Sequence, residues 1–128
     1  MGYYMDMIES RLWIKKENEN KALKAIKNAV RNGKITSWII ERDVEKSDNL
    51  QDAMTACRWE IEKLVNDNGY GRVYFDGEKL GDDYQLFEVL APFVEDGSYI
   101  EMSGEDGCLW RWVFENGKCK EIYPTITW

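Results

Sequence analysis

The C-terminal stretch SYIEMSGEDGCLWRWVFENGKCKEIY, residues 98–123, decides the fold. Two segments of alternating apolar and polar residues meet at Asp106-Gly107, and the second meets a third at Asn116-Gly117. Asp-Gly and Asn-Gly between alternating segments are typical of the tight turns that join antiparallel strands. We therefore expect three consecutive antiparallel strands, the last of which ends at Pro124.

Alternation in the middle strand assigns side chains to two faces. Cys108, Trp110, Trp112 and Phe114 share one face, and Leu109, Arg111 and Val113 share the other. If the aromatic face packs against helices, it belongs to the core. If it is open, Trp110 and Trp112 form an aromatic wall beside Arg111 that binds a partner or stacks on a ring. The sequence leaves both alternatives open.

Three helices are expected upstream of these strands. Leu23, Ile26 and Val30 repeat at helical spacing, with Asn18 or Asn20 at the start and Gly33 at the end. Capping-box patterns open the other two helices, at Asp48-x-x-Gln51 and Asp82-x-x-Gln85, and Pro92 limits the last one.

The remaining strands are less regular. Residues 3–14 alternate loosely and predict a strand that is irregular near 9–11, and residues 36–40 form a short β-rich run. Residues 58–65 fit both a helix and a strand, and we favour a hairpin in which they pair with 72–76. The element order predicts one α+β domain over 1–128, with an antiparallel sheet, helices on one face and a relation to the split β-α-β (ferredoxin-like) arrangement.

Composition restricts the class of protein. The chain has 128 residues, of which 44% are hydrophobic and 32% charged, as in globular domains. No apolar run approaches the roughly 18–20 residues of a membrane span, and the N-terminus lacks the pattern of a signal peptide. Three widely spaced cysteines favour reduced thiols. We expect a cytoplasmic protein that makes no membrane contact.

Histidine is absent from the chain. This removes the commonest general base, the usual zinc ligand and the usual partner of a nucleophilic serine or cysteine. We therefore expect no enzyme, no cofactor and no metal, and we expect Cys57, Cys108 and Cys119 to be small core residues. The alternative is a small hydrolase that uses Glu101 with Glu105 or Asp106 as acid and base.

Charge is distributed unevenly. Residues 1–40 hold eight Lys/Arg and four Asp/Glu, whereas 41–128 hold nine and twenty, which gives the net charge of −7. The stretch 82–106 holds eight acids and no base. Three interpretations of this stretch stay open: a solvated face, a mimic of nucleic-acid phosphates, or a site for a hard cation, for which the sequence signal is weak. Lys21, Lys24, Lys27 and Arg31 lie on one helix face, which is either solvated or a docking edge for an acidic partner or another copy.

Several motifs together resemble a group of small acidic proteins of phages and integrated mobile elements in Gram-positive bacteria. The motifs are residues 77–83, 90–102, 104–107 and 110–114, and the likeness covers roughly 72–124. No activity is established for that group, so the resemblance assigns no site residue. It implies a genetic setting in which small acidic proteins often inhibit host defence systems, as anti-CRISPR proteins do.

The sequence thus favours a non-enzymatic acidic binding protein whose partner is a host protein with a basic surface, such as a defence nuclease, with no direct contact to nucleic acid. The alternative from another class is a small-molecule or nucleotide-binding module that uses the aromatic face. The predicted partner-binding residues are Asp82, Asp83, Glu95, Asp96, Glu101, Glu105, Asp106, Trp110, Arg111 and Trp112.

Overall fold

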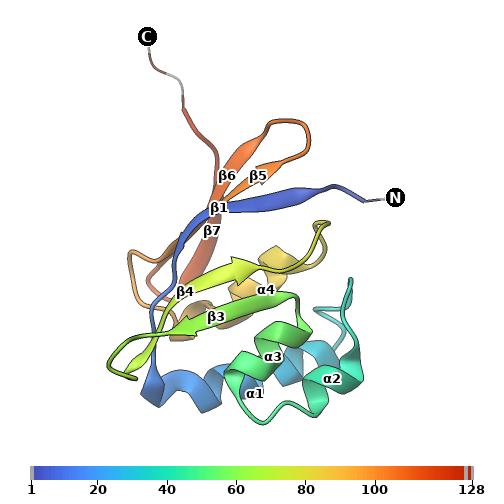
Figure 1. Cartoon of the computed structure of the whole chain (residues 1–128), viewed down its shortest axis with the longest axis vertical. Helices are drawn as coiled ribbons and strands as arrows, with labels where there is room; N and C mark the ends of the chain where they lie inside the picture. The colour runs from blue at the N-terminus through green and yellow to red at the C-terminus, as the bar shows by residue number, and fades with distance from the viewer. Residues whose placement is uncertain (1, 126, 128) are drawn as a thin grey trace.

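The computed structural model describes residues 2–125 and 127, and it confirms the α+β class (Figure 1). The strands are β1 (Met5–Arg11), β2 (Ile14–Lys15), β3 (Trp59–Lys63), β4 (Gly69–Phe75), β5 (Tyr99–Gly104), β6 (Leu109–Glu115) and β7 (Lys118–Ile122). The helices are α1 (Glu19–Arg31), α2 (Glu41–Glu45), α3 (Leu50–Ala56) and α4 (Asp83–Leu90), with 3-10 turns η1 (Lys16–Asn18) and η2 (Ala91–Phe93).

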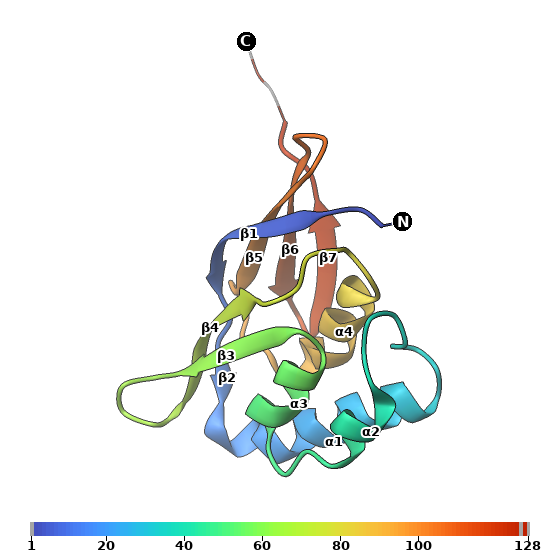
Figure 2. The ribbon, with the colours of Figure 1, turned by 45° about the vertical axis from the view of Figure 1, so that its right-hand side comes forward.

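The strands divide between two antiparallel sheets, whereas the sequence pattern predicts one. One sheet has the order β1-β5-β6-β7 and the other the order β2-β4-β3. A β-bulge lies in β1 between Met7 and Glu9, where the pairing with β5 shifts, and bulges bend the strand that carries them. The chain then passes through Leu12, whose backbone N–H donates to Gly71 of β4 at 3.0 Å. It enters the second sheet directly as β2 (Figure 2).

The predicted hairpins are confirmed. β5, β6 and β7 pair in succession, and the turn between β6 and β7 has positive φ at Asn116 (54°) and Gly117 (73°). Positive φ at both central residues defines the type I′ turn, one of the two tight turns that match the twist of a hairpin. β3 pairs with β4, with Trp59 opposite Phe75, so residues 59–63 form a strand rather than the end of a helix.

Helix positions are confirmed, but the starts of two helices differ from the prediction. The side chain of Asn49, rather than that of Asp48, caps α3 by accepting a hydrogen bond from the Asp52 N–H at 2.8 Å. Asp82 precedes α4 but makes no side-chain cap, because its carboxylate bonds elsewhere. Residues 36–40 form a loop instead of the expected strand, and the short helix α2 follows them.

An aromatic cluster fills the space between the two sheets and α4. Trp112 of β6 is fully buried, and its ring centroid lies 6.1 Å from that of Trp59 in β3 and 5.5 Å from that of Phe87 in α4. Trp110 is 6% exposed, so both tryptophans belong to the core. The opposite face of β1-β5-β6-β7, which we call the open sheet face, carries a row of side chains across the four strands: Glu9, Glu101, Arg111 and Ile122.

Candidate functional site

The neighbouring side chains of Tyr4, Trp38 and Lys79, together with the exposed Leu80 whose carbonyl meets the Trp38 indole, form a surface that we call the Trp38 patch. Tyr4 is 48% exposed, Trp38 53% and Leu80 37%. The Lys79 ammonium lies 5.1 Å from the ring centroid of Tyr4 and 5.7 Å from that of Trp38, within the range of a cation–π contact. The patch thus joins the N-terminal segment, the loop 36–40 and the loop that precedes α4.

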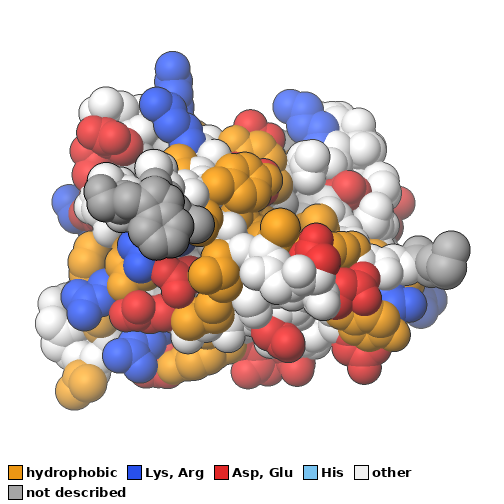
Figure 3. Space-filling model, turned by 90° about the horizontal axis from the view of Figure 1, so that it is seen from above, with side chains coloured by type: hydrophobic (Ala, Val, Ile, Leu, Met, Phe, Trp, Pro, Cys, Tyr) orange, Lys and Arg blue, Asp and Glu red, His pale blue; other side chains and the backbone are white. Residues whose placement is uncertain are grey.

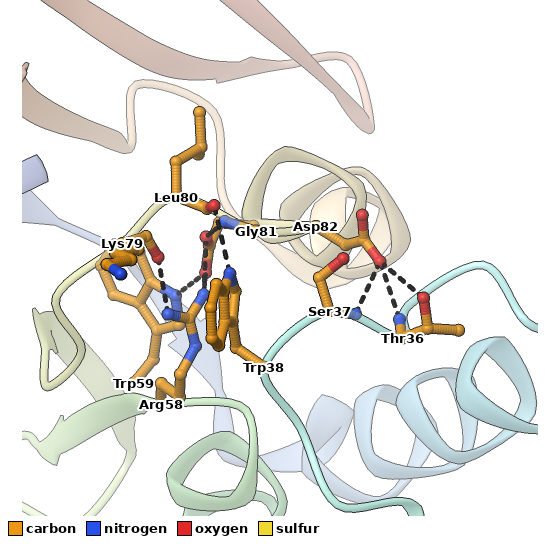
Figure 4. Close-up of polar contacts among 10 residues, drawn as sticks. Thr36, Ser37, Trp38, Arg58, Trp59, Lys79, Leu80, Gly81 and Asp82 are labelled. Carbon is orange, nitrogen blue, oxygen red and sulfur yellow. Dashed lines mark hydrogen bonds and ion pairs between the residues drawn. The ribbon is translucent and has the colours of Figure 1, made fainter. Parts of the chain in front are cut away.

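Trp38 has an uncommon backbone conformation. Its φ is +64°, a region that bulky L-residues rarely adopt. Its indole Nε1 donates to the Leu80 carbonyl at 3.3 Å (Figure 4). A Cβ at Gly81 would lie only 2.6 Å from Trp38 Cδ1, so glycine permits this close approach. The indole is therefore exposed and at the same time held in one position.

The carboxylate of Asp82 holds the loop that carries Trp38. It accepts hydrogen bonds from the backbone N–H groups of Thr36 at 2.8 Å and Ser37 at 3.0 Å, and from the Thr36 hydroxyl at 3.2 Å (Figure 4). Partial burial alone raises the pKa of Asp82, but the hydrogen bonds from Thr36 and Ser37 outweigh it and hold the pKa below its ordinary value. Asp82 is thus an anchor within the chain.

Asp83 supports the patch from beneath. Its buried carboxylate pairs with Arg58 Nη2 at 3.0 Å and accepts hydrogen bonds from Trp59 Nε1 at 2.8 Å and the Gly81 N–H at 2.9 Å. Arg58 Nη1 donates to the Lys79 carbonyl at 2.6 Å (Figure 4). These bonds fix residues 79–81, so the structure places Asp83 in the interior rather than on a contact surface.

Glu105 and Asp106 hold the N-terminal segment. The Tyr4 N–H donates to the Glu105 carboxylate at 3.2 Å, and the Glu105 N–H donates back to the Tyr4 carbonyl at 2.9 Å. Asp106 accepts from the Tyr3 hydroxyl and from the Cys108 N–H. The hydrogen bond from Tyr3 is the main reason that the pKa of Asp106 is lowered, and it raises the pKa of Tyr3 to about 12.

The other predicted acids are spread over the molecule. Glu95 pairs with Lys15 at 3.2 Å, Asp96 accepts from the Asn116 N–H at 2.9 Å, and Glu101 pairs with Arg111 on the open sheet face at 2.6 Å. Within the described residues, every acid between 82 and 106 except Glu88 has a hydrogen bond or an ion pair. One face of the surface shows carboxylates scattered among hydrophobic and basic side chains (Figure 3).

The burial of Trp110 and Trp112 decides between the two alternatives left open by the sequence. Their rings face the core, so they form no exposed wall beside Arg111. The aromatic surface on which a nucleotide base would stack is therefore absent from this face. The Trp112 indole N–H donates to Glu121 at 2.8 Å. Of the ten predicted partner-binding residues, the structure brings together Asp82, Asp83, Glu105 and Asp106 around the Trp38 patch, where they act as supports.

The groups considered for catalysis are engaged in structural contacts. Glu101 is ion-paired, and Glu105 and Asp106 anchor the N-terminal segment. A general acid needs a raised carboxyl pKa, whereas the hydrogen bonds of Asp106 lower it. Cys57 and Cys119 are core residues, and burial raises the pKa of each thiol to about 12. Cys108 is exposed, contrary to the expectation, because it ends the hairpin loop before β6.

No protein-family model, curated protein or solved structure matches this chain. Within residues 2–125 and 127, the side chains of Cys, Asp and Glu form no group of three or more that could hold a metal ion. Across the same residues, no helix is both long and apolar enough to cross a lipid bilayer.

None of the four residues of the Trp38 patch is among the partner-binding residues predicted from the sequence. Trp38 lies in the run 36–40, which was expected to be a strand, and Tyr4 lies in a predicted strand. The patch depends on contacts between segments that are distant in sequence, such as Trp38 with Leu80 and Tyr4 with Glu105. The only local signal was a large apolar pair, Trp38 and Ile40, near a glycine turn at Gly33.

Proposed function

We propose that this chain is a non-enzymatic binding protein that engages another protein through the Trp38 patch. The observation that carries the proposal is the fixed, half-exposed indole of Trp38, held at φ +64° by its own hydrogen bond and by the anchored loop. Backbone conformations of this kind cost free energy and are found preferentially at functional sites. A role in binding a partner therefore explains the costly backbone conformation of Trp38 better than an exposed side chain without a role does.

The composition of the patch supports a protein as the partner. Tryptophan and tyrosine are the residue types most enriched among the positions that contribute most to binding energy in protein interfaces. Because Asp82, Asp83 and Glu105 already hold the segments that carry the patch, little conformational entropy is lost when a partner docks. Lys79 brings one positive charge to the patch, and this charge is engaged by the faces of both rings, so it does not set the sign of the partner's surface.

The net charge of −7 supports a partner with a basic surface, since opposite potentials speed the encounter between two proteins. The resemblance to acidic proteins of phages and mobile elements supports a more specific form of the proposal. In that form the partner is a host protein that binds nucleic acid, such as a defence nuclease, and the chain inhibits it.

The test compares patch variants with a matched control. The wild-type chain is immobilised and used to capture proteins from a Gram-positive host lysate, and the affinity for the captured basic protein is then measured with purified components. We expect Trp38→Ala and Leu80→Asp each to weaken binding about 30-fold or more, the effect of losing about 2 kcal/mol. Tyr74→Ala removes an aromatic side chain that is exposed on β4, outside the patch, and should leave binding unchanged.

Circular dichroism and urea unfolding establish that each variant is folded. Leu80→Asp changes an exposed side chain without altering the backbone strain of Trp38, so it keeps the test valid if Trp38→Ala is unstable. Equal affinities of the wild type and of folded Leu80→Asp for the partner would refute the role of the patch.

A further inference from the structure

A second feature, separate from the Trp38 patch, lies on the open sheet face. A groove of about 270 Å³ runs between the ends of β6 and β7, and its walls are Glu101, Leu109, Trp110, Arg111, Ile122, Tyr123 and Pro124. Leu109, Ile122 and Tyr123 are exposed hydrophobic residues. Its volume lies just below the range of roughly 300–1,000 Å³ that is typical of small-molecule sites. The walls are mainly apolar, with one ion pair among them.

Arg111 is the charged group of the groove. Its Nε donates to Glu101 at 2.6 Å, and its guanidinium carbon lies 4.6 Å from the ring centroid of Tyr99. This bond and this stacking hold the guanidinium in one orientation. Within the described residues, neither Nη1 nor Nη2 of Arg111 has a hydrogen-bond acceptor, and the side chain is 44% exposed.

The groove has one acceptor group beside the Arg111 donors, because Glu101 is among its walls. Trp110 also lines the groove, but its indole is buried on the core side of β6, so its Nε1 offers no donor to a ligand. The Glu101 carboxylate is already paired through one oxygen with Arg111 Nε. The hydrogen-bonding capacity that remains at Arg111 is therefore that of two parallel N–H donors.

We propose that this groove binds a carboxylate attached to an apolar group. The two Nη groups of a guanidinium match the two oxygens of a carboxylate, and such bidentate pairs are among the strong hydrogen bonds in proteins. The apolar part of the ligand lies against Leu109 and Ile122 and excludes water from the pair, which strengthens it. The carboxylate is that of a small aliphatic or aromatic acid, because a groove of about 270 Å³ holds one small group.

The experiment is an NMR titration of the ¹⁵N-labelled chain with defined probes. Hexanoate and phenylacetate are compared with hexanamide and phenylacetamide, which have the same apolar parts but no charge. We expect the backbone signals of Leu109, Arg111 and Ile122 to shift saturably with the acids at millimolar concentration. The amides should bind at least about tenfold more weakly, because they lack the charge-assisted bonds. A peptide that ends in leucine, used as its free acid and as its amide, tests the other source of a carboxylate: tighter binding of the peptide acid than of the small acids would overturn the assignment.

Variants locate the site. Arg111→Gln should abolish the preference for acids over amides, and Leu109→Ala should weaken both kinds of probe. Lys120→Gln is the matched control: it removes a positive charge from the same sheet, where Lys120 pairs with Val113 and lies outside the groove. Its titration should equal that of the wild type. Equal binding of acids and amides, or an unchanged preference in Arg111→Gln, would overturn the proposal.

Discussion

Asp83 shows at the scale of one residue how this chain uses its acids. The carboxylate is buried and satisfied by Arg58, by the Trp59 indole and by the Gly81 N–H. A buried charge is tolerated only when it is paired and hydrogen-bonded. The same contacts fix the Lys79–Gly81 segment on which Trp38 rests, so the stability of the domain and the shape of the patch depend on one side chain.

Replacement of Asp83 by Ala should therefore be severe. It leaves the guanidinium of Arg58, whose side chain is 16% exposed, without its counter-ion, and the expected loss is about 3–5 kcal/mol in the free energy of unfolding. Asp82→Ala removes an anchor at the surface and should cost clearly less. Urea unfolding at neutral pH measures both variants. Similar losses for the two would contradict the assignment of Asp83 as the buried centre of the network.

The partners of these acids explain what the sequence could not reveal. The sequence shows the acid-rich stretch 82–106 directly. Whether its carboxylates are free at the surface or hydrogen-bonded within the chain depends on groups that lie far away in the sequence. Asp82 bonds to Thr36, and Glu105 bonds to Tyr4. No local pattern encodes such pairs, so the candidate site could not be predicted, although the residues that support it were singled out.

At the scale of elements, local sequence patterns predict a helix or a hairpin wherever a turn motif or the spacing of apolar residues determines it. The Asn116-Gly117 turn predicted the β6–β7 hairpin, and the spacing of Leu23, Ile26 and Val30 predicted α1. The run 36–40 did not form a strand, because the Asp82 carboxylate takes the N–H groups of Thr36 and Ser37. The division into two sheets follows from the path of β1, which pattern alone does not specify.

Ser10 connects the two sheets where they meet. Its buried hydroxyl donates to the Val73 carbonyl at 2.6 Å and accepts from the Val73 N–H at 3.1 Å, so it replaces a strand partner between β1 and β4. Ser10→Ala leaves both buried backbone groups without a partner, and we expect a loss of about 2 kcal/mol in the free energy of unfolding. Ser103→Ala, in β5 of the same sheet, should change it by less than about 0.5 kcal/mol.

Thermal or urea unfolding of the two serine variants measures the difference. If Ser10→Ala were as stable as Ser103→Ala, water or a backbone shift would satisfy Val73 equally well. The hydroxyl would then have no special part in joining the sheets.

At the scale of the whole molecule, the two sheets share one aromatic core. Trp59 of β3 touches Phe87 of α4 and Trp112 of β6, with ring centroids 4.9 Å and 6.1 Å apart. Among the residues that the structure describes, the buried hydrophobic side chains of both sheets belong to one cluster. The Trp38 patch and the groove beside Arg111 are thus two surfaces on a single packed body, and both depend on the same core.

Because the core is shared, the sheets should unfold together. Trp112→Phe shortens the side chain at the centre of the cluster and removes the hydrogen bond to Glu121, so the free energy of unfolding should fall by about 1–3 kcal/mol. Native-state hydrogen exchange should show an equal loss of protection for the amides of β3–β4 and of β5–β6, although Trp112 belongs only to the second group. If the β3–β4 amides kept their protection in Trp112→Phe while those of β5–β6 lost it, the two sheets would be separate cooperative units.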